Sequence, residues 1–419
     1  MMISQRKNIP LVRVKGFEEP WELCTVGEHI EDYVEKTTVQ NQYPVLTSSQ
    51  NKGIVRQEDY FSNRQVTTDS NIGYFVLPKG FFTYRSRSDN GVFKFNRNDL
   101  LDKGIISYFY PVFSIVEGDS DFYLKLLNTS ITKQAMLQAE GTGQKVLSLR
   151  KFKSIKTLVP SLPEQSAIGS LFRIVDDLLS SYKVNLANYQ SLKAAMLSKM
   201  FPKAGQTVPE IRLDEFEGEW ECLKMADIFK IIDGDRGKKY PGESDFFNVG
   251  HTLFLDTGNV KKTGLDFSSI KFISEEKDKE LRNGKLILGD FILTSRGTLG
   301  NVAYYDENIQ RDYSSVRINS AMLILRPLLG DKISHEYILA ILRGNLISDF
   351  MKVNQVGSAQ PHITKKEFSK IKVQAPSNIR EQQAIGAYFS NLDQLITSYQ
   401  DKIIQLETLK KKLLQDMFL

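Results

Sequence analysis

The chain has 419 residues, of which 41% are apolar, 25% charged and 11% aromatic. This is the composition of ordinary globular domains, so it excludes a disordered or collagen-like chain, and the length exceeds the roughly 250–300 residues that one hydrophobic core accommodates. Two cysteines exclude a disulfide scaffold and a four-cysteine zinc site, while a net charge of +5 permits nucleic-acid binding without requiring it.

Several protein classes lack support in the sequence. No stretch reaches the roughly 18 apolar residues that a membrane-spanning helix needs, and the N-terminal segment has no signal-peptide core, so we expect a soluble, cytoplasmic chain. The phosphate-binding loop, the serine-nucleophile elbow and the zinc-protease motif are also absent, as is the Asn/Asp-Pro-Pro-aromatic motif of amino-methyltransferases. We therefore expect no catalytic residue, no metal site and no cofactor in this chain.

A short segment near the N-terminus returns almost 200 residues later. Both tryptophans of the chain belong to this match, and a cysteine follows each of them closely. The matching residues keep one offset, which indicates a tandem duplication. They are Pro10, Arg13, Phe17, Glu18, Trp21 and Glu22 in the first copy, and Pro209, Arg212, Phe216, Glu217, Trp220 and Glu221 in the second.

The first predicted domain, residues 1–162, alternates short β-like runs with polar turns. We expect a helix at 121–127 and strands at 72–77, 91–95 and 105–116. The turn at 83–90 combines arginine with Ser, Thr and Asn, which are the side chains that donate to base edges and phosphates. A solvated hairpin with surface arginines remains an alternative for this turn. The candidate DNA-binding residues are Tyr84, Arg85, Ser86, Arg87 and Asn90.

A long helix is predicted within residues 163–202, where apolar residues recur in steps of four and three. This 3.5-residue period is typical of a left-handed coiled coil. The pattern is interrupted at Lys193, where we expect Leu192 to close the seam and the ammonium group to stay in water. Pro202 ends the helix, which is about 55 Å long. The predicted seam consists of Ile168, Phe172, Val175, Leu179, Tyr182, Leu186 and Tyr189.

The second predicted domain, residues 203–378, keeps the frame of the first but shares almost nothing with it between the frame segments. The two domains therefore read different things, or their loops have drifted on a shared scaffold. We expect strands at 285–294, 301–305 and 320–326 and a helix at 334–351. A polar turn again follows the first of these strands.

A second turn of this domain, at 233–241, is rich in basic residues, and its spacing does not fit a calcium loop. The candidate DNA-binding residues of the second domain are Asp235, Arg236, Lys238, Thr294, Ser295, Arg296, Thr298 and Asn301. Matching glycine turns at 141–145 and 357–362 either support the fold or contact DNA.

The second long helix, residues 379–419, repeats the first at an offset of 217, with Asn378 as its expected N-cap. Lys410 interrupts its seam, and we expect Leu409 to close it. The helices could pair with each other, dimerise the chain or bind a separate protein. Their matched length and register favour an antiparallel pair with pseudo-twofold symmetry. The predicted seam consists of Ile385, Phe389, Leu392, Ile396, Tyr399, Ile403 and Leu406.

These features define an α+β fold in which an α/β domain followed by a long helix occurs twice. Each helix begins alike, with Leu-Pro-Glu-Gln-Ser-Ala-Ile-Gly at 162–169 and Arg-Glu-Gln-Gln-Ala-Ile-Gly at 380–386. Two unlike domains, each followed by such a helix, resemble the specificity subunit of type I restriction–modification systems over the whole chain. The second helix departs from the pattern because Arg380 stands where proline is usual.

The resemblance implies that each domain is a target-recognition domain for one half of a bipartite double-stranded DNA site. It implies two adenine methyltransferase subunits and motor-nuclease restriction subunits as partners, with S-adenosylmethionine and ATP bound by those partners. Two alternatives stay open, a self-sufficient restriction–methylation enzyme and a coiled-coil scaffold for proteins.

Overall fold

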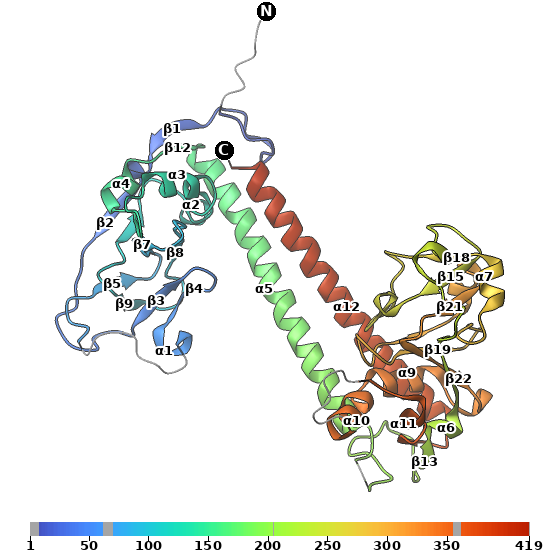
Figure 1. Cartoon of the computed structure of the whole chain (residues 1–419). Helices are drawn as coiled ribbons and strands as arrows, with labels where there is room; N and C mark the ends of the chain where they lie inside the picture. Colours follow the sequence, from blue (N-terminus) through green and yellow to red (C-terminus); the bar gives the residue numbers. More distant parts are fainter. Residues whose placement is uncertain (1–7, 62–69, 204, 355–361, 419) are drawn as a thin grey trace, which may run out of the picture. The chain divides into compact units, whose positions relative to one another are not determined.

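The computed structural model describes residues 8–61, 70–203, 205–354 and 362–418 (Figure 1). The chain forms two compact units that do not follow its linear order. The first unit runs to Lys183 and resumes at Lys402, and the second unit comprises Val184–Asp401. Each unit therefore contains one globular domain together with a part of each long helix.

The long helices α5 (Leu162–Lys199) and α12 (Ile379–Asp416) pack together in an antiparallel pair (Figure 1). In the first unit, Asp176 contacts Lys410 and Lys183 contacts Glu407. Because the position along α5 rises as the position along α12 falls, the helices run in opposite directions, as the sequence predicted. In the second unit the same order appears, with the Tyr189 and Tyr399 rings 5.3 Å apart and an ion pair between Lys193 and Asp393.

The seam of this helix pair is formed by apolar residues with one lysine in each helix. All fourteen predicted seam residues are buried or half-buried. Lys193 and Lys410 hold the next seam position, whereas Leu192 and Leu409 are 38% and 47% exposed. The expectation that these leucines close the seam is wrong. Each lysine can occupy the seam because its ammonium group pairs with an aspartate of the other helix, at 2.5 Å in both units.

Both domains are built on the same four-stranded antiparallel sheet. The strand order is β2-β10-β6-β8 in the first unit and β14-β22-β19-β20 in the second, so the strands correspond one to one. The strands of the first sheet are β2 (Ile30–Tyr33), β6 (Phe82–Tyr84), β8 (Phe95–Arg97) and β10 (Val112–Ile115). Those of the second are β14 (Phe229–Asp233), β19 (Phe291–Thr294), β20 (Val302–Tyr304) and β22 (Met322–Pro327).

A two-stranded antiparallel sheet leads into each long helix. Strand β1 (Glu22–Thr25) pairs with β12 (Lys156–Val159), which immediately precedes α5. In the second unit, β13 (Glu221–Lys224) pairs with β23 (Lys372–Ala375), which precedes α12. The repeated sequence thus forms the strands and helices of the shared frame.

Among the remaining elements, α2 and α4 of the first unit correspond in position to α9 and α11 of the second, whereas most of the others differ, in agreement with the unlike sequences. The first unit contains β3 (Leu46–Ser49), β4 (Gly53–Arg56), β5 (Phe75–Pro78), β7 (Arg87–Ser88), β9 (Lys103–Ile106), β11 (Lys145–Val146), α1 (Gln57–Tyr60), α2 (Ser120–Leu127), α3 (Ser130–Gln138) and α4 (Leu149–Lys153). The second contains β15 (Thr252–Leu255), β16 (Val260–Lys261), β17 (Gly264–Leu265), β18 (Phe272–Ile273), β21 (Val316–Ile318), α6 (Met225–Ile228), α7 (Glu275–Glu280), α8 (Glu307–Asp312), α9 (His335–Arg343), α10 (Leu346–Asn354) and α11 (Lys365–Phe368).

Two predicted elements are interrupted. The run 105–116 contains two strands, β9 and β10, because Pro111 and the turn before it separate them. The helix predicted at 334–351 breaks at Gly344 into α9 and α10. An added Cβ at Gly344 would lie 2.9 Å from the Ala340 carbonyl oxygen, so the break depends on the missing side chain.

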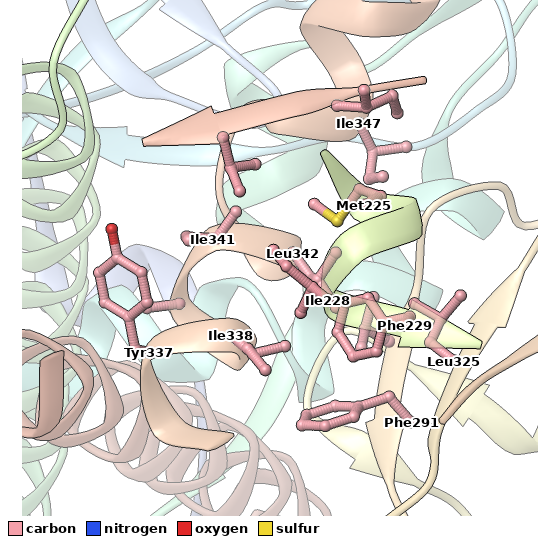
Figure 2. Close-up of a cluster of buried hydrophobic side chains, with 14 of the residues drawn as sticks. Met225, Ile228, Phe229, Phe291, Leu325, Tyr337, Ile338, Ile341, Leu342 and Ile347 are labelled. Carbon is pink, nitrogen blue, oxygen red and sulfur yellow. The ribbon is translucent and has the colours of Figure 1, made fainter. Parts of the chain in front are cut away.

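The main core of the second unit lies between α9 and the four-stranded sheet (Figure 2). Ile338 and Leu342 of α9 lie on the side of Phe291 and Leu325 of the sheet. Tyr337 points away from the sheet, and its ring contacts Phe201 and Trp220. In the first unit, α2 takes the equivalent place. The end of α12 completes that core, since Met417 and Phe418 are buried in it.

Candidate nucleic-acid interface

The Glu-Gln pair at the start of each long helix holds the frame together. Glu164 is 1% exposed and receives two hydrogen bonds of 2.7 Å from the Arg13 guanidinium. In the second unit, Arg212 makes the same two-pronged contact with Glu381, at 2.7 and 2.8 Å. This geometry matches the planar fork of arginine to a carboxylate. The two repeated arginines are therefore structural clamps, each of which joins the segment at the start of its repeat to the start of the long helix.

The glutamine and glycine of each motif connect the long helix to the helix that packs on the sheet, which is α2 in the first unit and α9 in the second. Gln165 accepts a hydrogen bond from the Asp119 backbone N–H at 3.0 Å, and Gln382 accepts one from Ser334 at 2.9 Å. Gly386 lies so close to α9 that an added Cβ would meet the Tyr337 backbone nitrogen at 2.7 Å. The Glu-Gln-x-Ala-Ile-Gly motif thus has a packing role in both units. The Asn378 side chain caps α12 by accepting from the Arg380 N–H at 2.9 Å.

In the first unit, the polar turn follows β6 and presents two arginines. Arg85 and Arg87 are exposed, and the Arg87 guanidinium lies 4.4 Å from the centre of the Phe109 ring. Ser86 donates to the Phe109 carbonyl at 2.7 Å, which fixes the turn between them. Asn90 accepts hydrogen bonds from Ser88 and from the Val92 backbone N–H, so it shapes the turn although it is exposed.

The glycine turn at 141–145 supports this loop. Gln144 donates to Asp89 at 2.8 Å, and Lys145 lies in β11, which pairs with β7 of the loop. The matching turn at 357–362 lies outside the described residues except for His362. The first of these turns therefore leads into β11, where Lys145 pairs with Ser88 and Val146 pairs with Arg87.

In the second unit, the equivalent turn follows β19 and ends before β20. Arg296 and Thr298 are exposed, whereas the Asn301 amide is half-buried and donates to the Val260 carbonyl at 2.8 Å. Thr298 donates to the Thr257 carbonyl at 3.2 Å. Gly297 has a φ of +71°, a left-handed conformation that glycine adopts without strain. The turn is thus fixed at several points while the Arg296 side chain is at the surface.

The turn at 233–241 meets this loop at residues 319–321. Arg236 donates to the Ser320 carbonyl at 3.0 Å, and the Arg296 backbone N–H donates to the Ala321 carbonyl at 3.2 Å. Arg236 and Lys238 are both exposed. Two segments that lie about sixty residues apart in the sequence therefore form one basic surface region. The sequence alone did not indicate residues 319–321, whose only signal is an Asn-Ser turn between two buried strands.

Four of the residues predicted to bind DNA have buried side chains, unlike the exposed positions that the prediction assumed. Tyr84 and Thr294 are 0% exposed, Ser295 is 1% exposed and Asp235 is 8% exposed. Tyr84 donates to the Leu147 carbonyl at 3.0 Å and Ser295 to the Ala321 carbonyl at 2.9 Å. These side chains fix the loops from below and do not reach the surface.

Asp235 shows how such a buried residue supports its turn. Its carboxylate accepts hydrogen bonds from the backbone N–H groups of Gly237 and Arg282, at 2.7 and 2.6 Å. Burial opposes ionisation, but these backbone donors outweigh it and lower the pKa of Asp235. The residue is therefore a charged structural anchor for the turn that carries Arg236.

Within the described ranges, no three His, Cys, Asp or Glu side chains gather in a way that could hold a metal ion. No helix there combines the length and the apolar content that a bilayer crossing requires.

The chain matches known proteins along its whole length. The family described as "Type I restriction modification DNA specificity domain" matches twice, at residues 21–216 and 217–408. The MjaVIII specificity subunit of a type I restriction enzyme from Methanocaldococcus jannaschii is 22% identical over 99% of this chain and 96% of its own length. The putative MjaX specificity subunit of the same organism is also 22% identical, over 65% of this chain and 60% of its own length.

The fold is found in solved structures as well. The S subunit of a type I restriction–modification system from M. genitalium superposes with a TM-score of 0.60 and 15% identity, covering 98% of this chain and 99% of that one. A chain from a study of complex assembly and conformational transition in the type I R-M system gives a TM-score of 0.51 at 14% identity, covering 96% of this chain and 99% of that one. With two family matches that span nearly the whole sequence, the chain belongs to the type I restriction–modification DNA specificity family.

Proposed function

We propose that this chain is the sequence-recognition subunit of a type I restriction–modification complex, in which each domain reads one half of a bipartite DNA site. The observation that carries this proposal is the pairing of one frame with two different loop sets. The clamps, sheets and helix starts are the same in both units, while the loops after β6 and β19 present different basic residues. Different loops on one scaffold suit two different half-sites.

The exposed arginines are the proposed readers. A guanidinium can donate two hydrogen bonds to guanine O6 and N7 in the major groove, where every base pair has its own donor and acceptor pattern. Arg85 and Arg87 would act in the first unit, and Arg236, Lys238 and Arg296 in the second. The buried residues beneath them keep the loops in place, so that little conformational entropy is lost when the loops contact bases.

The proposed partners are two adenine methyltransferase subunits and, where restriction occurs, motor-nuclease subunits. S-adenosylmethionine and ATP would bind to those partners, and the chain itself would carry out no chemistry. The methyltransferase would take an adenine out of the base stack in each half-site and methylate it. The antiparallel helices would set the number of unread base pairs between the half-sites.

The test is methylome sequencing of cells that express this chain with its methyltransferase partner, compared with cells that lack only this chain. A split motif with modified adenine in each half, present only with the chain, is the expected result. Replacing residues 225–355 with the corresponding segment of another specificity subunit should change one half-site and leave the other. A soluble complex that adds no new motif would contradict the proposal.

A second assay separates this function from its alternatives. The purified chain alone should show no methylation or cleavage of target DNA, and activity in that assay would point to a self-sufficient enzyme. A complex that binds its protein partners but has no affinity for DNA at any salt concentration would point to a protein scaffold.

A further inference from the structure

A group of basic side chains surrounds one aspartate in the first unit, where α2 packs beside the long helices. Lys125 of α2 lies 2.6 Å from one carboxylate oxygen of Asp176. Lys410 of α12 lies 2.5 Å from the other oxygen. One carboxylate of α5 therefore holds two ammonium groups, and the side chains of Lys125 and Lys410 are only 15% and 29% exposed.

Lys94 lies near this cluster, where strand β8 packs against the end of α2. It directly precedes β8, whose Phe95 exchanges backbone hydrogen bonds with the Asn128 side chain at the end of α2. Lys94 is half-buried, and within the described residues it has no hydrogen bond and no ion pair. Burial, together with repulsion from Lys125 and Lys410, lowers the pKa of Lys94.

The acidic groups nearby are already engaged. Arg97 of β8 pairs with Asp99 and Asp121, both at 2.7 Å, and Arg173 of α5 lies 3.5 Å from Asp121. The ion pairs of this region thus join Arg97, Lys125, Arg173 and Lys410 to Asp99, Asp121 and Asp176. The Lys94 ammonium group is left without a carboxylate partner among the described residues.

We propose that Lys94, Lys125 and Lys410 form a binding site for a backbone phosphate of DNA that flanks the half-site read by the first domain. A phosphodiester supplies the negative charge that the cluster lacks, and partial burial makes the attraction stronger than it would be in open water. The loop that carries Arg85 and Arg87 leads through residues 88–93 directly to Lys94. A phosphate held there would fix the position of the loop on the duplex without reading its sequence.

The second unit offers an internal comparison. Its Lys193–Asp393 pair corresponds to the pair between Lys410 and Asp176. Counted from the N-cap residues of α9 and α2, however, Ala340 stands where α2 has Lys125, and Asn301 precedes β20 where Lys94 precedes β8. Arg343 of α9 brings a second cation near Asp393, but its guanidinium donates to the Val302 carbonyl at 3.3 Å. Because the second unit has no counterpart of the unpaired Lys94, we place this phosphate contact beside the first half-site only.

This inference rests on the proposed function, and its test uses the full chain assembled with its methyltransferase partner. The affinity for a duplex that contains the target is measured between 50 and 200 mM salt for the wild type, Lys94→Gln and Lys94→Arg. Each lost phosphate contact lowers the slope of log affinity against log salt by about 0.9. Between 50 and 200 mM salt, the DNA affinity of the Lys94→Gln complex should therefore fall about threefold less than that of the wild type, with the methylated motif unchanged. Lys94→Arg should restore the wild-type slope.

Lys183→Gln is the matched control, because Lys183 lies on α5 in the same unit but is paired with Glu407 at the surface. Its slope should remain that of the wild type. A Lys94→Gln complex with wild-type slope, while the wild type still binds its target specifically, would overturn the phosphate site and leave the proposed function intact. A wild-type complex without sequence preference would instead contradict the proposed function.

The source of the phosphate is tested separately by thermal unfolding of the full chain with inorganic phosphate. Weak stabilisation, or none, is expected, because a single free ion lacks the other contacts of a DNA backbone. Strong stabilisation that is lost in Lys94→Gln, without any change in the DNA salt slope, would assign the cluster to a free anion and refute the DNA contact.

Discussion

Replacing Arg13 with methionine should destabilise the first unit strongly, because it strands a buried carboxylate. Glu164 is 1% exposed, and its two hydrogen bonds from Arg13 are its described side-chain contacts. Removing one partner of a buried ion pair costs about 3–5 kcal/mol. Since Arg13 is 12% exposed, water can partly replace it, and we expect the lower end, about 3 kcal/mol. For a unit of this size, that corresponds to a loss of about 6–12 °C in melting temperature.

The two tryptophans allow each unit to be followed separately. Trp21 lies in the core of the first unit and Trp220 in that of the second, so a Trp220→Phe background reports on the first unit alone. Denaturant unfolding is measured for Arg13→Met, for Glu164→Leu and for the double variant. The double variant should regain much of the loss, because no unpaired charge remains. The reasoning is refuted if Arg13→Met costs less than about 1 kcal/mol, or if the double variant is no more stable than the single one.

Three further predictions concern the frame. Phe418→Ala should destabilise the first unit by about 3–5 kcal/mol, and Phe201→Ala should act on the second unit instead, as read by the tryptophan of each unit. Replacing Gly169 or Gly386 with alanine should lower the free energy of unfolding by about 1–3 kcal/mol, because the added methyl group overpacks the contact. An unchanged melting temperature would contradict this prediction. Burial opposes ionisation of Asp176, but its two lysine partners outweigh burial and lower its pKa below the ordinary aspartate value. The stability difference between wild type and Asp176→Asn should therefore be full above about pH 4 and shrink as the pH falls. A series of melting curves at different pH values measures this difference.

Much of the frame could be predicted from the sequence because its signals are local and repeated. The heptad spacing identified the seam of α5 and α12, and the constant offset identified the duplication. Register is fixed by such periodic patterns, so the antiparallel pairing followed from two matched helices in one chain. What the pattern could not show is that Lys193 and Lys410 would stay in the seam. A lysine is tolerated there only if a carboxylate of the other helix is within reach, and this depends on packing that a single helix does not reveal.

The candidate interface was harder to predict because exposure is not a local property. Polar residues at the end of a strand can point into the domain or out of it, and Thr294, Ser295 and Asp235 point inward, where they bind backbone groups. Lys94 has no local sequence signal that marks it as a binding residue. It stands alone between two phenylalanines, and only the fold brings Lys125 and Lys410 near it.

The architecture explains how one frame can hold interchangeable recognition loops. In the first unit, the centre of the Phe418 ring, just after α12, lies 6.4 Å from that of Trp21 and 5.8 Å from that of Phe172. In the second unit, Phe201 after α5 packs 6.3 Å from Trp220. Each domain core is thus closed by the helix end of the other copy, through residues that both copies share. Because none of these residues belongs to the loops after β6 and β19, a loop can change its sequence without disturbing the closure. The duplication therefore separates the shared residues that close the cores from the loop residues that differ between the two copies.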